Sequence, residues 1–587
     1  MRRFPTLAVI VTLAAGGLAA CSLIGDEQAT PAPNTKPCAG ANGVGGAVPA
    51  GLGPGDLVGA SELDQATYTK SSGYPTGADV FRILYVSTGL DNTDLQLVCG
   101  LVVAPGSGPK TSFSDGSPGS GRMLAWAHGT IGLQQRCQPS SSTAFWGAMP
   151  DGIGAVAWGT PILLNRHEGR ERDGMLQYAI NQGWVVSATD YQPPDTYLAG
   201  RIAAANVLDA NRAAAQLVAK QWPNHAPDRY QYVVAGHSQG GDTVMFTGQL
   251  AESYLATTQP SHPTAALDLV GLDADAPASN FVADPARQPA VQYGDGLADS
   301  EMHQTVKPLI LDLPAITLQI GPALFSYIFG SWAQLSKTAP TPGATLPASP
   351  PTGPLDLTAI ATPKGVKTVA AMAPICLDQA KPLKAATSEY RNAKANAMLL
   401  PEIWNLPANY STGDYFKGGF DRVCATTTDP GITEWCDWVR WNTPGPLGVN
   451  PYPKVPTVGA KPVPVLIAQG EQDDVVNCVA PSGLPVAEPV GPARCSSRTL
   501  YDALAADTYC RAGEAPTGHL QMAQFRQIRF QSPADHFSIR GQISAKGQAK
   551  NANVLTFEGS PLQHFIAGAF AGTLTPGCTV TVLNARS

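Results

Sequence analysis

The chain has 587 residues, more than one hydrophobic core usually accommodates, so we expect one large domain with a long insertion, or two domains. Its 44% hydrophobic content is that of an ordinary globular protein, whereas 60 glycines and 52 prolines predict many loops and long connections. A formal net charge of −7 over this length argues against nucleic acid as a partner.

The N-terminus has the pattern of an export signal. Two arginines precede an apolar run, Leu7–Leu18, which is too short to span a bilayer and ends in small residues before Cys21. A cysteine at this place resembles a bacterial lipobox, which implies that residues 1–20 are removed and that Cys21 is lipidated; an ordinary signal peptide is the alternative. We therefore expect an exported lipoprotein on the extracytoplasmic face of the cell membrane. Residues 21–60, rich in Gly, Ala and Pro, would form a flexible tether.

The other ten of the eleven cysteines fit an exported protein. An even number predicts disulfides, up to five, and the lack of any C-x-x-C spacing argues against a zinc site. Close spacing favours the pairs Cys424–Cys436 and Cys478–Cys495, and a Cys510–Cys578 bond would tie down the C-terminus. Sequence alone does not fix this connectivity.

Strand and helix patterns alternate in the first half of the folded body. An Ala-rich amphipathic stretch, Leu198–Trp222, predicts a long helix. Such alternation predicts a mainly parallel sheet with helices on both faces. The strand-like runs are Phe81–Thr88, Leu95–Val103, Met123–Ala127, Trp184–Ala188, Tyr230–Ala235 and Leu267–Asp273.

This alternation stops at about residue 279 and resumes with the strand-like Val463–Ala468. We therefore predict a core made of residues 61–278 and 462–587, interrupted by a mostly helical cap at residues 279–461. Two segments of the cap have apolar runs. Val369–Pro374 is a strand or a buried helix, and Leu309–Gly330 is a buried or lid helix because a carboxylate and prolines interrupt it.

The stretch 236–240, Gly-His-Ser-Gln-Gly, lies between a strand-like run and a predicted helix over residues 241–250. A serine on a sharp strand-to-helix turn between glycines is the nucleophile elbow of α/β-hydrolases. Side chains in place of Gly236 or Gly240 would collide with neighbouring backbone. The pattern predicts Ser238 as the nucleophile and His237 as a packing or orienting residue.

An oxyanion intermediate needs two backbone N–H donors, one from the residue after the nucleophile and one from an early loop. Gln239 is the first donor. The second is Gly129 or Thr130, which follow an early strand, and His128 is expected to orient that loop.

A serine hydroxyl becomes a nucleophile when a histidine takes its proton and a carboxylate holds that histidine. The acid is expected after a late strand, and Asp473 lies three residues beyond Gly470, directly after one. Its neighbour Asp474 is the alternative, and the position favours Asp473.

Three histidines follow this acid. His536 is favoured as the base because it follows a strand-like run, Gln527–Phe530, and a turn. His564 follows another strand-like run, Val554–Phe557, but starts a closing helix. His519 lies in a Gly-containing connection with no strand just before it.

These motifs together resemble the actinobacterial relatives of the secretory lipase (lipase A-like) family, in patches from about residue 60 to the C-terminus. The matching segments are Trp126–Thr130 with Cys137–Ser140, Gly183–Val186 with Asp190 and Tyr191, His237–Gly241, Gly470 with Asp473, and Tyr509 and Cys510 with Gly513. The resemblance implies hydrolysis of carboxylic esters or triacylglycerols by a Ser-Asp-His triad beneath a helical cap. These roles fall on Ser238, Asp473 and a late histidine.

The chain departs from the family pattern in two respects. Extra residues separate its late histidine from the Tyr-Cys-x-x-Gly segment, and lipid anchoring is not a general family trait. The ending, residues 561–572, resembles the closing helix of the family, which places His564 inside that helix and favours His536.

The leading expectation is a monomeric surface lipoprotein that hydrolyses an ester or lipid substrate and needs no cofactor or metal. An acyltransferase or peptidase would share the same triad. A non-catalytic binding lipoprotein would also keep the fold, but Ser238 and Asp473 both lie where the chemistry needs them.

Overall fold

The computed structural model describes residues 38, 43–63, 75–90, 94–113, 120–141, 175–192, 196–281, 317–338, 354–376, 424, 427–450, 452–471, 473, 476, 478–479, 494–525, 527–529, 532–533, 536 and 559–583. Cys21 with the export signal, Asp474 and the strand-like run 554–557 lie outside these residues, as does most of the predicted cap.

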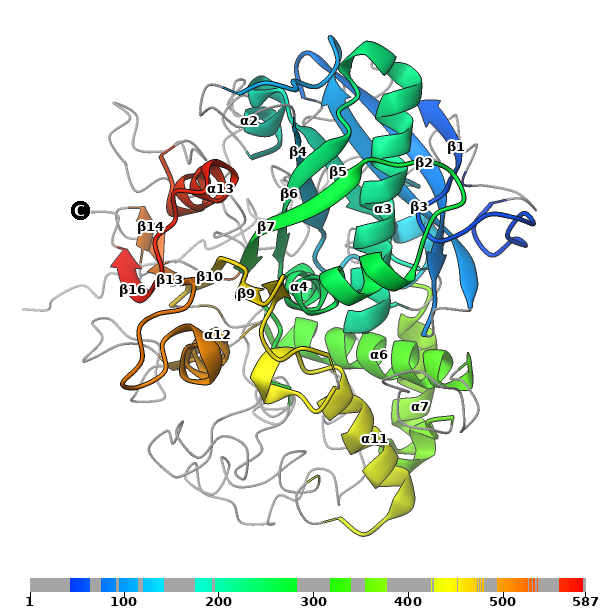
Figure 1. The fold of residues 1–587 in the computed structure, drawn as a ribbon. Coiled ribbons are helices and arrows are strands. Elements are labelled where there is room, and N and C mark those ends of the chain that lie inside the picture. The colour runs from blue at the N-terminus through cyan, green and yellow to red at the C-terminus, as the bar shows by residue number, and fades with distance from the viewer. Residues whose placement is uncertain are drawn as a thin grey trace, which may run out of the picture.

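A ten-stranded sheet forms the centre of the molecule (Figure 1). In spatial order its strands are β1 (Leu57–Glu62), β2 (Ala78–Thr88), β3 (Leu95–Pro105), β5 (Val185–Thr189), β4 (Gly121–Ala127), β6 (Arg229–His237), β7 (Ala266–Asp275), β10 (Val465–Gly470), β13 (His519–Phe525) and β16 (Gly577–Leu583). The pairs β1–β2, β2–β3 and β3–β5 are antiparallel, and every later pair is parallel. The carboxyl ends of β4, β6, β7 and β10 therefore lie at one edge of the sheet, where α/β proteins place their sites.

Helices cover both faces of this sheet. The α-helices of the described residues are α2 (Met175–Gln182), α3 (Gly200–Gln221), α4 (Gln239–Thr257), α6 (Thr317–Leu335), α7 (Pro363–Met372), α11 (Pro430–Trp441), α12 (Ser496–Leu504) and α13 (Pro561–Ala571). α3, α4 and α12 pack on one face, and α2 and α13 pack on the other. The layers follow from the period of two in a strand: in β10, Val465 and Ile467 face the first set of helices, whereas Leu466 and Ala468 face the second. This is the α/β-hydrolase architecture predicted from the sequence.

The structure corrects two sequence interpretations and resolves two that were left open. Residues 57–60, expected to end the flexible tether, belong to β1 at the edge of the sheet. His519 is the first residue of β13, a strand between β10 and β16 that the sequence analysis did not predict. The segment 369–374 continues and ends a helix, α7, and the described part of 309–330 belongs to α6, in which Tyr327 and Phe329 are buried. None of the helices in the described ranges has the length and apolar character needed to cross a membrane.

Four disulfides join described residues, and two of them were predicted. Cys424–Cys436 and Cys510–Cys578 are confirmed. Cys38–Cys99 and Cys137–Cys376 were not predicted; they link cysteines 61 and 239 residues apart in sequence. Cys478 and Cys495 face each other in the two-stranded pair of β11 (Cys478–Val479) and β12 (Arg494–Cys495), and their bond stays a prediction.

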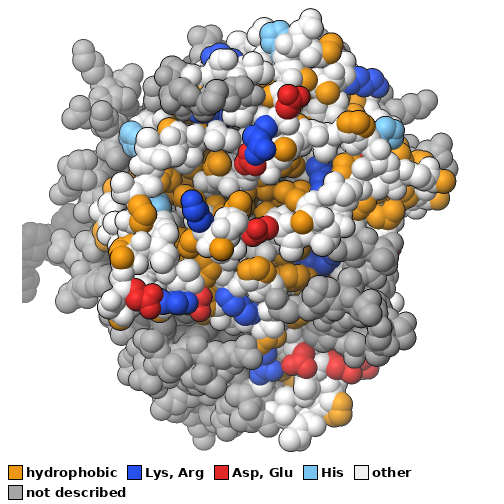
Figure 2. All heavy atoms as spheres, in the orientation of Figure 1, with side chains coloured by type: hydrophobic (Ala, Val, Ile, Leu, Met, Phe, Trp, Pro, Cys, Tyr) orange, Lys and Arg blue, Asp and Glu red, His pale blue; other side chains and the backbone are white. Residues whose placement is uncertain are grey.

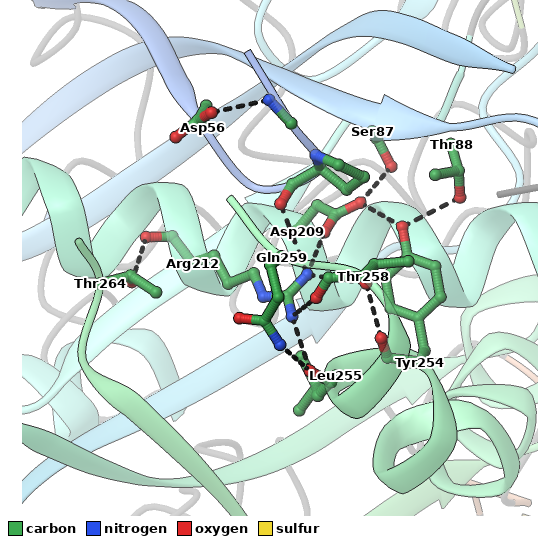
Figure 3. A network of polar contacts seen from close by, with 12 residues as sticks. Asp56, Ser87, Thr88, Asp209, Arg212, Tyr254, Leu255, Thr258, Gln259 and Thr264 are labelled. Carbon is green, nitrogen blue, oxygen red and sulfur yellow. Dashed lines mark hydrogen bonds and ion pairs between the residues drawn. The ribbon is translucent and has the colours of Figure 1, made fainter. Parts of the chain in front are cut away.

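A buried polar network joins α3 to its neighbours (Figure 3). Arg212 forms an ion pair with Asp209 at 3.2 Å, with the two side chains 4% and 0% exposed. Ser87 of β2 and Tyr254 of α4 donate hydrogen bonds to the same carboxylate, at 2.8 and 2.6 Å. Burial raises the pKa of Asp209 to about 6, although Arg212 acts in the opposite direction. Because both side chains are buried, this i, i+3 pair is part of the structural core.

The face of the molecule in Figure 2 carries scattered positive and negative side chains among hydrophobic ones. Its described part shows no continuous basic surface.

Candidate active site

Ser238 occupies the turn between β6 and α4 in a strained backbone conformation, with φ 60° and ψ −117°. Positive φ is rare for a residue with a side chain and persists only where the surroundings enforce it. Here the N–H of Ser238 donates to the carbonyl of Asp275 on β7 at 2.8 Å. Its own carbonyl accepts from the N–H of Asp242 at 3.2 Å, in the first turn of α4.

The glycines of the elbow are required by close backbone approach, as the sequence analysis expected. A Cβ at Gly236 would lie 2.7 Å from the carbonyl oxygen of Ala127 at the end of β4. A Cβ at Gly240 would clash with the same oxygen still more closely. At Gly241 it would lie 2.7 Å from the Cα of Pro277. The turn can therefore lie this deep between β4 and β7 only with glycine at these positions.

Asp473 follows the carboxyl end of β10 and is paired with His536. The Nδ1–H of His536 donates to Oδ2 of Asp473 at 2.8 Å, and both side chains are buried. The carboxylate also accepts from Gln469 Nε2 at 2.7 Å and from the backbone N–H of Val476 at 2.8 Å. Three N–H donors thus satisfy this buried carboxylate.

The candidate base lies directly against the elbow. Nε2 of His237, the residue before Ser238, is 2.7 Å from the carbonyl oxygen of His536, and the two imidazole rings have centroids 4.4 Å apart. Residues 299 positions apart in sequence are thus brought together at the carboxyl edge of the sheet.

The other two late histidines lie elsewhere. His564 is an exposed residue of α13. His519 starts β13, and because β10 and β13 are parallel, it lies at the edge opposite to the one where Asp473 follows β10. Its Nδ1 contacts the carbonyl oxygen of Thr575 at 2.8 Å.

The 128–130 loop after β4 also lies against the elbow. A Cβ at Gly129 would be 3.7 Å from the Cβ of Ser238 and 3.2 Å from the carbonyl oxygen of His237. Thr130 donates its hydroxyl to Tyr197 at 3.0 Å. Gln239 is the first residue of α4, and backbone N–H groups in the first turn of a helix have no intrahelical acceptor. Both predicted donor segments therefore flank the serine.

His128 holds this loop from within the protein. Its Nδ1–H donates to the carbonyl of Gly129 at 2.7 Å, and its own carbonyl accepts from the hydroxyl of Tyr191 at 3.0 Å. The ring of Tyr191 packs on the imidazole with centroids 4.3 Å apart. Burial lowers the pKa of His128 to about 4, so the imidazole is neutral at pH 7.

Sequence reasoning missed one residue of the site. Gln469 holds the carboxylate of Asp473, and its signal was a polar residue inside an otherwise apolar strand. Asp190, which the family resemblance singled out, is fully buried and accepts from the backbone N–H of Ser140 at 2.9 Å. In α11 of the predicted cap, Trp435, Trp438 and Trp441 are buried.

No protein-family model and no curated protein matches the sequence. The fold is similar to that of Candida antarctica lipase A, with 13% identity and a TM-score of 0.47 over 90% of this chain and 85% of that one. It is also similar to the rice cell wall degrading esterase LipA from Xanthomonas oryzae, with 13% identity, a TM-score of 0.43 and coverage of 79% and 91%. A putative hydrolase from Legionella pneumophila has 14% identity, a TM-score of 0.41 and coverage of 82% and 93%. At these identities the similarity concerns the fold alone.

Proposed function

We propose that this protein is a serine hydrolase that cleaves carboxylic esters through an acyl-enzyme on Ser238. The observation that carries the proposal is the buried Asp473–His536 hydrogen bond, held against the residue that precedes the strained serine. A strained nucleophile turn, a histidine and a carboxylate that orients the histidine are the parts that acyl transfer needs.

In the proposed mechanism, the oxygen of Ser238 attacks the ester carbonyl while His536 takes the hydroxyl proton. Asp473 holds the imidazole through Nδ1 and stabilises the imidazolium that forms. The oxyanion is bound by the backbone N–H of Gln239 and by that of Gly129 or Thr130. His536 returns its proton to the departing alcohol, and a water molecule, deprotonated by the same histidine, releases the acid.

The test is hydrolysis of p-nitrophenyl esters, from acetyl to palmitoyl, by soluble protein that begins at Ser22. Ser238→Ala and His536→Ala should each lower kcat by about 10⁴-fold or more, since members of a triad act as a unit. The matched control is His564→Ala, which removes an exposed histidine and should leave turnover unchanged. Full turnover in Ser238→Ala, or loss in His564→Ala with His536→Ala unaffected, would contradict the assignment.

We also propose that Cys21 carries a lipid that tethers the enzyme to the outer face of the cell membrane. The apolar run and the small residues before this cysteine support the proposal. The full chain, expressed in a bacterium that exports and lipidates such proteins, should sediment with membranes, and Cys21→Ala should release it into the soluble fraction. Equal partition of the two proteins would rule out lipidation at this residue.

A further inference from the structure

His237 is the last residue of β6, and its side chain is 3% exposed. In the sheet it is in register with Asp275 of β7, whose carbonyl accepts the N–H of Ser238. The end of β6 therefore positions both the imidazole of His237 and the nucleophile that follows it. Among the described residues, His536 contacts the imidazole by its ring, and Asp275 occupies the paired position on β7.

The contact between His237 and His536 shows which nitrogen of His237 carries a hydrogen. A backbone carbonyl can only accept a hydrogen bond, so Nε2 of His237 must carry the hydrogen that reaches the carbonyl oxygen of His536 at 2.7 Å. This bond holds the main chain of the candidate base, whereas Asp473 holds its side chain through Nδ1 at 2.8 Å. His536 is thus attached at two points, one to the β10 end and one to the elbow.

The same imidazole borders the 128–130 loop. A Cβ at Gly129 would lie 3.5 Å from Nδ1 of His237 and 3.2 Å from its carbonyl oxygen, so the loop packs directly on this residue. His237 therefore precedes the nucleophile in the chain and contacts both the candidate base, His536, and the loop predicted to donate to the oxyanion.

We propose that His237 is a positioning residue, which fixes His536 and the 128–130 loop relative to Ser238. This inference rests on the proposed hydrolase function. The proton transfer needs Nε2 of His536 to point at the oxygen of Ser238. A single attachment would let the ring of His536 rotate about it, whereas two attachments fix the position of the ring. A misplacement of about 1 Å in such a group costs on the order of 100-fold in rate.

The test compares two substitutions at this position. His237→Phe keeps a planar ring but removes the donor, whereas His237→Gln keeps an N–H at nearly the same reach. With a p-nitrophenyl ester, His237→Phe should lower kcat by about 10- to 100-fold, with KM changed by less than about threefold. His237→Gln should recover most of the lost kcat. His225→Gln, at an exposed histidine that precedes the amino end of β6 and so lies at the other end of that strand from the elbow, is the control. Urea unfolding shows that each variant is folded.

A second readout needs no substrate. In protein labelled with ¹⁵N-histidine, the Nδ1–H of His536 that bonds to Asp473 should give a strongly downfield proton resonance. Asp473→Asn should abolish this resonance and so assigns it. We expect it to be broadened or lost in His237→Phe and kept in His237→Gln.

The results for the two variants decide whether His237 positions His536. A folded His237→Phe protein with wild-type kcat and an unchanged resonance overturns the inference, as does a His237→Gln protein that is as slow as His237→Phe. Wild-type protein that hydrolyses no ester refutes the proposed function instead, and the resonance then still decides whether His237 positions His536.

Discussion

His128 and Asp190 are buried next to each other, and burial shifts their pKa values in opposite directions. Burial lowers the pKa of His128 to about 4, because desolvation penalises the imidazolium. Burial raises the pKa of Asp190 to about 6, although the hydrogen bonds from Ser140 oppose the shift. Both residues support the 128–130 loop, since Tyr191, the neighbour of Asp190, packs on His128.

The two shifts give opposite contributions to stability. His128 has a folded pKa below its ordinary value of 6.5, so its contribution is present above that pH and is lost as the pH falls towards about 4. Asp190 has a folded pKa above its ordinary value of 3.8, so its contribution is present below that pH and is lost as the pH rises through about 6. Between about pH 4 and 6 the two slopes oppose each other.

Asp190→Asn removes the contribution of Asp190 to the change of stability with pH and keeps an oxygen that can accept from the N–H of Ser140. The variant should therefore lose stability more steeply than the wild type as the pH falls from about 6.5 to about 4, because the contribution of His128 is no longer opposed. Urea unfolding at a series of pH values measures the slope, and Asp228→Asn, at an exposed position, is the control. Equal slopes in wild type and Asp190→Asn would show that Asp190 does not titrate in this range.

Among the elements, the sequence predicted best those whose pattern is local and continuous. β6 and β10 are short apolar runs, and α3 is a long Ala-rich repeat, so their limits were found within a few residues. β13 was missed because glutamines at 521 and 524 interrupt its apolar residues, and only its place between β10 and β16 explains why it is a strand. β16 alternates Val and Thr at 579–582, a strand signal that was present and not used.

In the site, too, local features could be predicted from the sequence, whereas features that depend on distant residues could not. The elbow is a local feature, since strand, glycines and helix follow one another, and Ser238 could be placed from them. The histidine could not be chosen with the same clarity, because the Asp473–His536 pair spans 63 residues. The decisive fact about His519 was its place at the start of a parallel strand, which requires the sheet order.

At the scale of the whole molecule, two helices of the predicted cap, α6 and α7, are attached to the 128–130 side of the site. The Cys137–Cys376 disulfide joins the segment after β4 to the segment after α7, and Gln134 donates to the carbonyl of Ala373 beside it at 3.1 Å. On α6, the indole N–H of Trp332 donates to the carbonyl of Tyr197, whose hydroxyl accepts from Thr130. Because connectivity over 239 residues depends on the complete fold, no sequence spacing could predict this disulfide. The boundaries of the cap, residues 279 and 461, stay predictions.

The proposed function depends on Ser238 being a nucleophile that His536 and Asp473 activate. Its most direct test is covalent labelling by a fluorophosphonate probe, followed by peptide mass spectrometry, because the reaction needs no knowledge of the natural ester. We predict one adduct, on Ser238, that is absent in Ser238→Ala and forms on the order of 10³-fold more slowly in His536→Ala. A folded wild-type protein that forms no adduct, or labelling of His536→Ala at the wild-type rate, would contradict it.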